Sequence, residues 1–159
     1  QAGVLSYESG GVHGFVLEED IELDGDLVIG GGILDLNGHS CHVKGDLIID
    51  NGAISMTNEH DRLNVDGDFT TSSMIDHGGM LTDGIMEIKG DFIQRRNAHS
   101  FEATGNHTTI FSGVNRQKVT FRNNKYSHFN NLIFLSFVIF SCLFAIGKFL
   151  LVTIILLLI

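Results

Sequence analysis

The sequence predicts an all-β protein, a right-handed parallel β-helix (solenoid) with a coil period of about 20–23 residues. A pattern of alternating apolar and polar residues around a Gly-Asp step occurs four times, at 21–29, 41–49, 63–71 and 86–94. The glycines of the four copies, at positions 25, 45, 67 and 90, recur at a nearly constant interval. Self-similarity of this kind is typical of a solenoid, in which each repeat forms one coil and parallel crossovers are right-handed.

Each copy predicts two short strands that meet at a corner. Alternate residues of a strand share one face, and here that face is apolar. The glycine lies midway along it, where a residue without a side chain lets the backbone bend or approach its neighbour closely. We expect these glycines to line one edge of the solenoid, with one large apolar residue of each coil stacked inside. The glycines are Gly25, Gly45, Gly67 and Gly90, and the stacked residues are Leu27, Leu47, Phe69 and Phe92.

A third strand is expected to complete each coil. Leu34 and Leu36 lie between the first two copies, and Ile54 and Met56 lie between the next two. Clusters of Gly and Asn flank these residues and indicate turns. Three strands and three corners in one repeat fit a parallel β-helix whose coils are spaced by about 4.8 Å.

The residue before each glycine supports this register. The four residues alternate in charge, so that stacked coils would place opposite charges side by side, a favourable cross-strand pairing. They are Asp24, Lys44, Asp66 and Lys89.

Charge is distributed unevenly along the 159 residues. Positions 1–85 hold 16 acidic and 2 basic side chains, whereas positions 86–131 hold 3 acidic and 7 basic ones. The acidic coils disfavour nucleic acid, and the basic cluster is too sparse to indicate binding to it. We therefore expect no nucleic-acid partner.

The C-terminal segment, 132–159, has a different composition. It is apolar except for Lys148 and a few small polar residues, and it is long enough for one membrane-spanning helix. Lys148 in mid-segment opposes insertion. The restricted use of Phe, Ile and Leu also fits an out-of-frame reading of AT-rich DNA. Three interpretations stay open: a membrane anchor, an artefactual or frame-shifted tail, and a buried cap helix.

These observations divide the chain into three parts. Residues 1–15 are Gly-rich and weakly patterned, and we interpret them as an N-terminal cap or the end of a preceding coil. Residues 16–131 form the solenoid, and residues 132–159 form the apolar tail. The chain begins at Gln1 with no recognisable signal peptide, so we interpret it as a fragment or a processed chain.

The aspartates that follow the glycines form the main candidate metal site. Stacked carboxylates about 5 Å apart could hold Ca²⁺, which takes oxygen ligands from several residues. The alternative, which we favour, is that each side chain caps its own corner by accepting a hydrogen bond from a backbone N–H. We therefore predict no metal and no cofactor, with Ca²⁺ as the exception to test. The column consists of Asp26, Asp46, Asp68 and Asp91.

Other candidate chemistry is weaker. His39, Cys41 and His42 are close in sequence, but strand alternation turns Cys41 inward and His42 outward, so the three should not converge on a metal. The chain has no Gly-x-Ser-x-Gly, phosphate-loop or dinucleotide-binding motif. We predict no catalytic residues and no enzymatic activity.

Five stretches resemble the β-helical repeat regions of large bacterial, particularly Gram-positive, cell-surface and secreted proteins. The resemblance covers about residues 16–134, and it implies a structural stalk or adhesin-like module beside other domains. A more distant resemblance is to bactofilins, polymerising β-helical cytoskeletal proteins. The stretches are Leu34–His39, Met56–His60, Leu81–Phe92, Ala103–His107 and Phe129–Leu132.

The sequence thus favours a non-catalytic structural or adhesin-like module at the cell surface or outside the cell. Its expected partners are other domains of a larger protein and a glycan or host surface, with the membrane included only if 132–159 is an anchor. The alternatives are a polysaccharide-active β-helix (lyase or hydrolase) and a bactofilin-like polymerising scaffold. The enzyme is disfavoured because sugar sites commonly offer aromatic platforms, and the chain has no Trp and only two Tyr.

Overall fold

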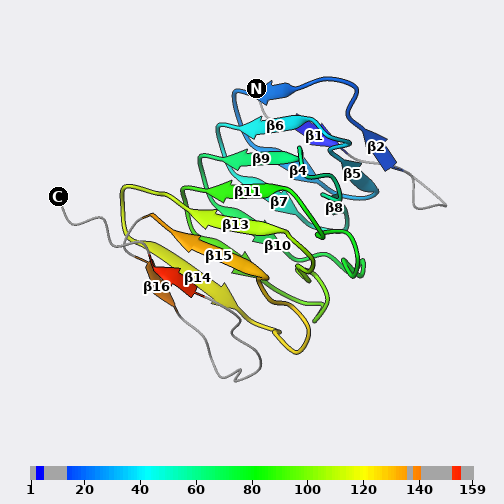
Figure 1. The fold of residues 1–159 in the computed structure, drawn as a ribbon. Coiled ribbons are helices and arrows are strands. Elements are labelled where there is room, and N and C mark those ends of the chain that lie inside the picture. The colour runs from blue at the N-terminus through cyan, green and yellow to red at the C-terminus, as the bar shows by residue number, and fades with distance from the viewer. Residues whose placement is uncertain (1–2, 6–13, 136–137, 141–151, 155–159) are drawn as a thin grey trace.

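The structure is a computed structural model that describes residues 3–5, 14–135, 138–140 and 152–154. Every regular element in these residues is a β-strand, and the strands pair in parallel. Successive coils stack in layers into a solenoid of about 6 turns (Figure 1). The predicted fold class, an all-β parallel solenoid, is confirmed.

Two seven-stranded sheets form two sides of the solenoid. The first has the order β1-β4-β7-β10-β12-β14-β16 and the second the order β17-β15-β13-β11-β9-β6-β3. The strands of the first sheet are β1 (Gly3–Leu5), β4 (Leu27–Ile29), β7 (Leu47–Ile49), β10 (Phe69–Thr71), β12 (Phe92–Gln94), β14 (Gln117–Phe121) and β16 (Val138–Phe140). Those of the second are β3 (Ile21–Leu23), β6 (Ser40–Val43), β9 (Arg62–Val65), β11 (Ile85–Ile88), β13 (Thr108–Phe111), β15 (Asn131–Phe134) and β17 (Val152–Ile154).

The third side is regular only in the first coils. There β2 (Gly14–Val16), β5 (Ile33–Asp35) and β8 (Ala53–Ser55) form a three-stranded sheet. Beyond β8 it continues as isolated bridges, which join Met56 to Leu81, Leu81 to Ala103 and Glu102 to His128. The predicted third strand is therefore present in the early coils, and longer loops replace it later.

The predicted register holds along the interior. Leu27 pairs with Leu47, Leu47 with Phe69, and Phe69 with Phe92 in adjacent parallel strands. All four side chains are buried. The rings of Phe69 and Phe92 stack with their centroids 5.3 Å apart, and Phe101 meets both edge-on. Burial of this apolar column, worth about 25 cal/mol per Å², holds the coils together.

The two ends of the chain are described only in part. Strand β1 pairs with β4 and β2 pairs with β5, so parts of residues 1–15 join the sheets. In the tail, β15 pairs with β13, β16 with β14, and β17 with β15. The interpretations of 132–159 as an anchor, a cap helix or frame-shifted sequence fall largely outside the described residues. Within the described ranges, no helix has the length and apolar character needed to cross a membrane.

Candidate functional site

The Gly-Asp corners form a continuous edge where coil meets coil. A Cβ atom on Gly45 would overlap Oδ1 of Asp26 and lie 2.7 Å from the carbonyl carbon of Gly25. Gly67 and Gly90 are confined in the same way by the coil before them. Because backbone atoms of the neighbouring coil occupy this space, a side chain could be added only by separating the coils. The glycines allow close stacking.

The aspartates that follow these glycines connect successive coils through hydrogen bonds. Oδ1 of Asp26 accepts from the backbone N–H of Asp46 at 2.8 Å, and Oδ1 of Asp46 accepts from that of Asp68 at 2.8 Å. Oδ1 of Asp68 accepts from the N–H of Asp91 at 2.7 Å, and Oδ1 of Asp91 from that of Lys118 at 2.8 Å. Each carboxylate thus caps the corner of the next coil, whereas we expected it to cap its own.

We call this series of hydrogen bonds the aspartate ladder, and in it each side chain uses one carboxylate oxygen to accept from a backbone amide. Among the described residues, the ladder contributes no group of three ligand atoms that lie within 4.8 Å of one another. The expectation that the column of Asp26, Asp46, Asp68 and Asp91 holds no metal, with Ca²⁺ as the alternative, stays a prediction.

The column of alternating charge forms ion pairs between neighbouring coils. Nζ of Lys44 lies 2.7 Å from Oδ1 of Asp24, and Nζ of Lys89 lies 2.7 Å from Oδ1 of Asp66. Hydrogen bonding to Lys44 lowers the pKa of Asp24, and hydrogen bonding to Asp24 and Glu22 raises the pKa of Lys44. The two pairs account for the first and last steps of the alternation, and the second partner of Lys44 is Glu22 of the preceding coil at 2.5 Å.

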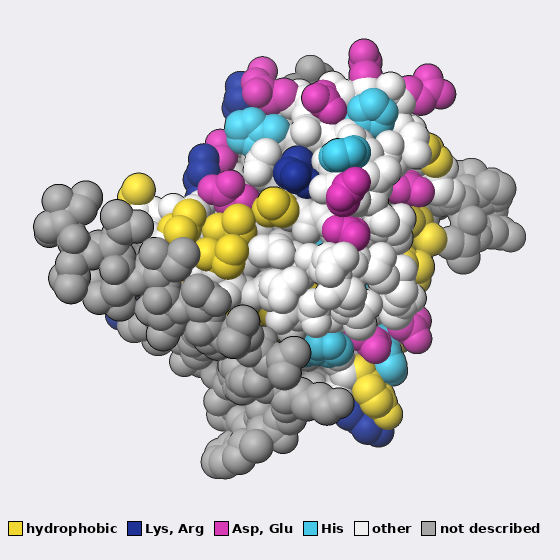
Figure 2. Space-filling model, in the orientation of Figure 1, with side chains coloured by type: hydrophobic (Ala, Val, Ile, Leu, Met, Phe, Trp, Pro, Cys, Tyr) yellow, Lys and Arg dark blue, Asp and Glu magenta, His cyan; other side chains and the backbone are white. Residues whose placement is uncertain are grey.

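The same face holds a hollow of about 220 Å³. Figure 2 shows charged and histidine side chains gathered over the first coils of this face. His42 lies at the hollow with its two ring nitrogens directed to different acids: Nδ1 is 3.4 Å from Glu22 and Nε2 is 3.1 Å from Asp66. The hollow is open to solvent, and its lining residues are His42, Asn64, Val65, Glu87 and Lys89.

His39, Cys41 and His42 take the places that strand alternation predicts. Cys41 is buried in the core, where desolvation raises the pKa of its thiol to about 11. His42 faces outward, and Nδ1 of His39 lies 3.5 Å from Asp20 at a corner. The three side chains do not meet at one point.

Two further histidines are buried in the later coils. Desolvation lowers the pKa of His77 to about 4, and Nε2 of this ring lies 3.3 Å from the carbonyl oxygen of Gly52. Burial also lowers the pKa of His107, whose Nδ1 lies 2.8 Å from the carbonyl oxygen of Asp83. Both rings thus fasten one coil to the preceding one, and no sequence pattern pointed to either of them.

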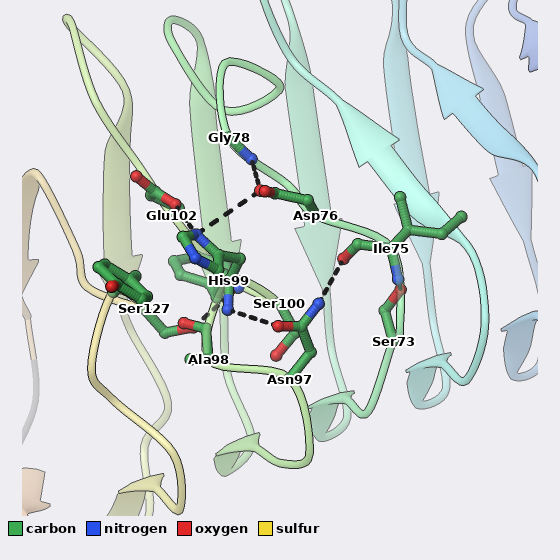
Figure 3. A network of polar contacts seen from close by, with 12 residues as sticks. Ser73, Ile75, Asp76, Gly78, Asn97, Ala98, His99, Ser100, Glu102 and Ser127 are labelled. Atoms are coloured by element: carbon green, nitrogen blue, oxygen red, sulfur yellow. Dashed lines mark hydrogen bonds and ion pairs between the residues drawn. The ribbon is translucent and has the colours of Figure 1, made fainter.

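Within the described part of the chain, one group of side chains that could ligate a metal does converge, and it was not predicted from the sequence. Asp76 lies in the loop between β10 and β11, whereas His99 and Glu102 lie in the loop between β12 and β13 of the next coil. Nδ1 of His99 is 2.6 Å from Oε2 of Glu102 and 3.7 Å from Oδ1 of Asp76 (Figure 3). One ligand atom from each residue lies within 4.8 Å of the others. We call these three residues the His99 cluster.

Surrounding contacts hold the His99 cluster in place. The ring of Tyr126, from the following coil, stacks on that of His99 with their centroids 4.1 Å apart. The backbone N–H of Gly78 donates to Oδ1 of Asp76, and the N–H of His99 donates to Oδ1 of Asn97. The Asn97 amide also donates to the carbonyl of Met74 at 3.1 Å and so ties the two loops together.

A sequence signal for the cluster did exist. The interval from Asp76 to His99 equals the interval from Gly67 to Gly90 in the same two coils. Ligating residues one coil period apart should stack as neighbours.

Comparisons with protein-family models, with curated proteins and with solved structures find no match for this chain.

Proposed function

We propose that the protein is a non-catalytic structural module, a rigid spacer of adhesin-like type in a larger cell-surface or secreted protein. The observation that supports this most strongly is the continuity of its axial connections. The aspartate ladder runs from Asp26 through Asp46, Asp68 and Asp91 to Lys118, and so bonds five successive coils. Backbone hydrogen bonds join Gly45 to Gly25, Gly67 to Gly45, and Gly90 to Gly67 beside it.

The interior adds a second axial connection. The interior of the later coils is rich in aromatic rings. The ring of Phe92 contacts those of Phe111 and Phe129 in the next coil, and the ring of Phe101 also contacts that of Phe129. Aromatic pairs of this kind contribute about 0.5–1.5 kcal/mol each beyond the area they bury. A stack held by both backbone ladders and close-packed rings resists bending, and rigidity is what a spacer requires.

The surface also favours this function over an enzymatic one. Glycoside hydrolysis uses two carboxyl groups that flank a bound sugar, and the aspartates of the ladder instead lie in a row and bond backbone amides. The hollow beside His42 is partly open to solvent, whereas catalysis benefits from a site that excludes water. In this proposal the partners are flanking domains and a glycan or host surface, and the location is the cell surface or the extracellular space.

The experiment that tests the non-catalytic assignment is an activity assay on a panel of acidic and neutral polysaccharides and on peptidoglycan. We expect no release of reducing or unsaturated sugar ends above that of a heat-denatured sample. Reproducible release that is lost in Asp68→Asn or Asp91→Asn, with folding retained, would overturn the proposal. Release that persists in both variants would indicate a contaminating enzyme, and repurification to constant specific activity would decide this.

A further inference from the structure

We infer that the His99 cluster binds one divalent first-row transition-metal ion, for which Zn²⁺ is the probe, and that the ion cross-links two successive coils. Asp76 belongs to the loop 72–84, and His99 and Glu102 belong to the loop 95–107. A single ion bound to all three side chains would therefore connect the two loops. This inference does not depend on the proposed spacer function.

The donor set selects the class of ion. It consists of one imidazole nitrogen and two carboxylate groups. Ca²⁺ and Mg²⁺ are bound through oxygen ligands, whereas imidazole nitrogen suits Zn²⁺ and its first-row neighbours. Zn²⁺ accepts nitrogen and carboxylate oxygen at about 2.0–2.2 Å and keeps water in an open position when the protein supplies three ligands. The side chain of Asp76 is 65% exposed, which leaves that position accessible.

The electrostatics of the cluster favour a cation. Two carboxylates approach the same atom of a single imidazole ring, the nitrogen Nδ1. Nδ1 of His99 can donate one hydrogen bond, and Oε2 of Glu102 accepts it at 2.6 Å. Asp76, at 3.7 Å, lies beyond an ordinary hydrogen bond to the ring. A divalent ion would bring both carboxylates and the nitrogen into contact with one positive charge.

The surrounding contacts already set the geometry of the cluster. Tyr126 stacks on the imidazole and fixes its plane, Gly78 orients the carboxylate of Asp76, and Asn97 ties the two loops. Ligands that are held before the ion arrives lose less conformational entropy when they bind it. Shifts of about 1–2 Å in the Asp76 and Glu102 side chains would bring the ligand atoms, now within 4.8 Å of one another, to bonding distance.

The chain provides a matched control in His42. This histidine also has two acidic neighbours, but Glu22 lies at Nδ1 and Asp66 at Nε2, on opposite sides of the ring. One ion cannot contact both acids and one nitrogen there. His42 and His99 are exposed to a similar extent, 30% and 31%. The comparison thus separates convergent geometry from mere proximity of histidine and acids.

The test is a Zn²⁺ titration of the full chain, by calorimetry and by thermal unfolding, in chelator-free buffer with a phosphine reductant. We expect binding of one ion per chain and a melting temperature that rises with Zn²⁺ concentration, because a ligand of the folded state stabilises it. Loss of a partner that only hydrogen-bonds a ligand typically costs about 10–100-fold in metal affinity, so His99→Gln should weaken binding at least tenfold. His42→Gln should leave the affinity unchanged.

A second variant guards against a folding defect in His99→Gln. Asp76→Asn changes an exposed side chain, keeps the acceptor for Gly78, and should fold normally while it weakens Zn²⁺ binding. Co²⁺ supplies an independent readout, since its visible absorption bands should appear with the wild type and with His42→Gln but not with His99→Gln. The inference is overturned if the wild type does not bind Zn²⁺ at 1:1, if His99→Gln and Asp76→Asn bind it as tightly as the wild type, or if His42→Gln loses as much affinity. None of these results bears on the polysaccharide assay.

Discussion

The first coils and the later coils share two sides but differ on the third. In the first coils β2, β5 and β8 form a regular sheet, and the outer face carries ion pairs such as Lys44 with Asp24. In the later coils isolated bridges replace the third strand, and several polar side chains of the strands and loops are buried. These polar residues are Thr71, Ser73, His77, Gln94, Ser100, His107, Thr109, Gln117 and Ser127, whereas in the earlier coils Asp61 is the one buried polar residue among those described.

The difference shows where a solenoid can acquire chemistry. A coil of minimal length has just enough residues for three strands and three corners. Its backbone N–H and C=O groups are therefore all used in strand pairing and turns. In the later coils, side chains such as Gln94 bond the loop that follows them and the N–H of Asn123 in the next coil, and other side chains converge. The His99 cluster lies in these longer loops, and the aspartate ladder connects both kinds of coil.

The largest effect is expected from a charge in the regular core. Leu47→Asp places a carboxylate at a fully buried position between Leu27 and Phe69. An unpaired buried charge costs several kcal/mol, a large part of a typical stability of about 5–15 kcal/mol. We expect loss of the β signal in circular dichroism at room temperature. Ile48→Asp, on the half-buried outward side of the same strand, should remain folded. An equal loss of stability in Leu47→Asp and Ile48→Asp would contradict the prediction that Leu47 points inward and Ile48 outward.

Acid should destabilise the later coils through His77. The pKa of this histidine is about 4 in the folded protein and 6.5 as its ordinary value. Its contribution to stability is therefore complete above pH 6.5 and is lost as the pH falls toward 4, because the unfolded chain binds the extra proton. At about 1.36 kcal/mol per pKa unit, the loss reaches about 3 kcal/mol. His107 acts in the same direction.

Urea unfolding between pH 4 and 8 measures this dependence. His77→Gln should flatten the curve between pH 4 and 6.5, whereas His60→Gln, which alters an exposed ring, should preserve its shape. A pH dependence that is identical in the wild type and in His77→Gln would show that burial of His77 does not set the acid limit.

Gln94 tests whether side chains replace the third strand. Its amide donates to the carbonyl of Asn97 at 2.8 Å and to the hydroxyl of Ser100 at 2.9 Å, and it accepts from the N–H of Asn123 at 3.0 Å. Gln94→Ala should cost about 1–3 kcal/mol, since the buried Ser100 and the half-buried Asn97 would lose a hydrogen-bond partner. Hydrogen exchange should quicken in 95–107 and 122–130 and stay unchanged at β5 and β8. Uniform acceleration would mean that the two regions unfold as one unit.

The smallest effect is expected at the aspartate ladder. Asp46→Asn keeps an oxygen that can accept from the N–H of Asp68, so stability should change little. Asp46→Ala removes this cap and should cost about 0.5–2 kcal/mol, as other caps do. A chelator added to the wild type should leave the Asp46 corner unaffected; a fall in melting temperature that Asp46→Asn abolishes would instead show that the column holds Ca²⁺.

The inner columns could be predicted from the sequence because strand alternation and a fixed period determine which residues stack. Leu27, Leu47, Phe69 and Phe92 are one column in the structure as predicted. That each aspartate caps the next coil could not be predicted, since this depends on the distance between coils at the corner. The His99 cluster was missed because the segments 72–84 and 95–107 have no alternation, and only the shared coil period connects Asp76 to His99.

The central proposal is that the protein is a rigid spacer whose length is set by the number of coils. The most direct test is to measure the distance between two labelled coils. Glu22 and Ile133 belong to one outward column that runs through His42, Asn64, Glu87 and Ile110. The two native cysteines are replaced by serine or alanine, and new cysteines at positions 22 and 133 carry spin labels. Pulsed electron paramagnetic resonance then gives the distance between the two labels.

A second chain carries a duplicate of residues 40–61, which is one coil in register with the next, since Ser40 pairs with Arg62. The account predicts a narrow distance distribution in both chains and a mean that is longer by about 4.8 Å in the second, the spacing of adjacent strands. An unchanged mean, or a broad distribution in the original chain, would contradict the proposal that the solenoid is a rigid spacer.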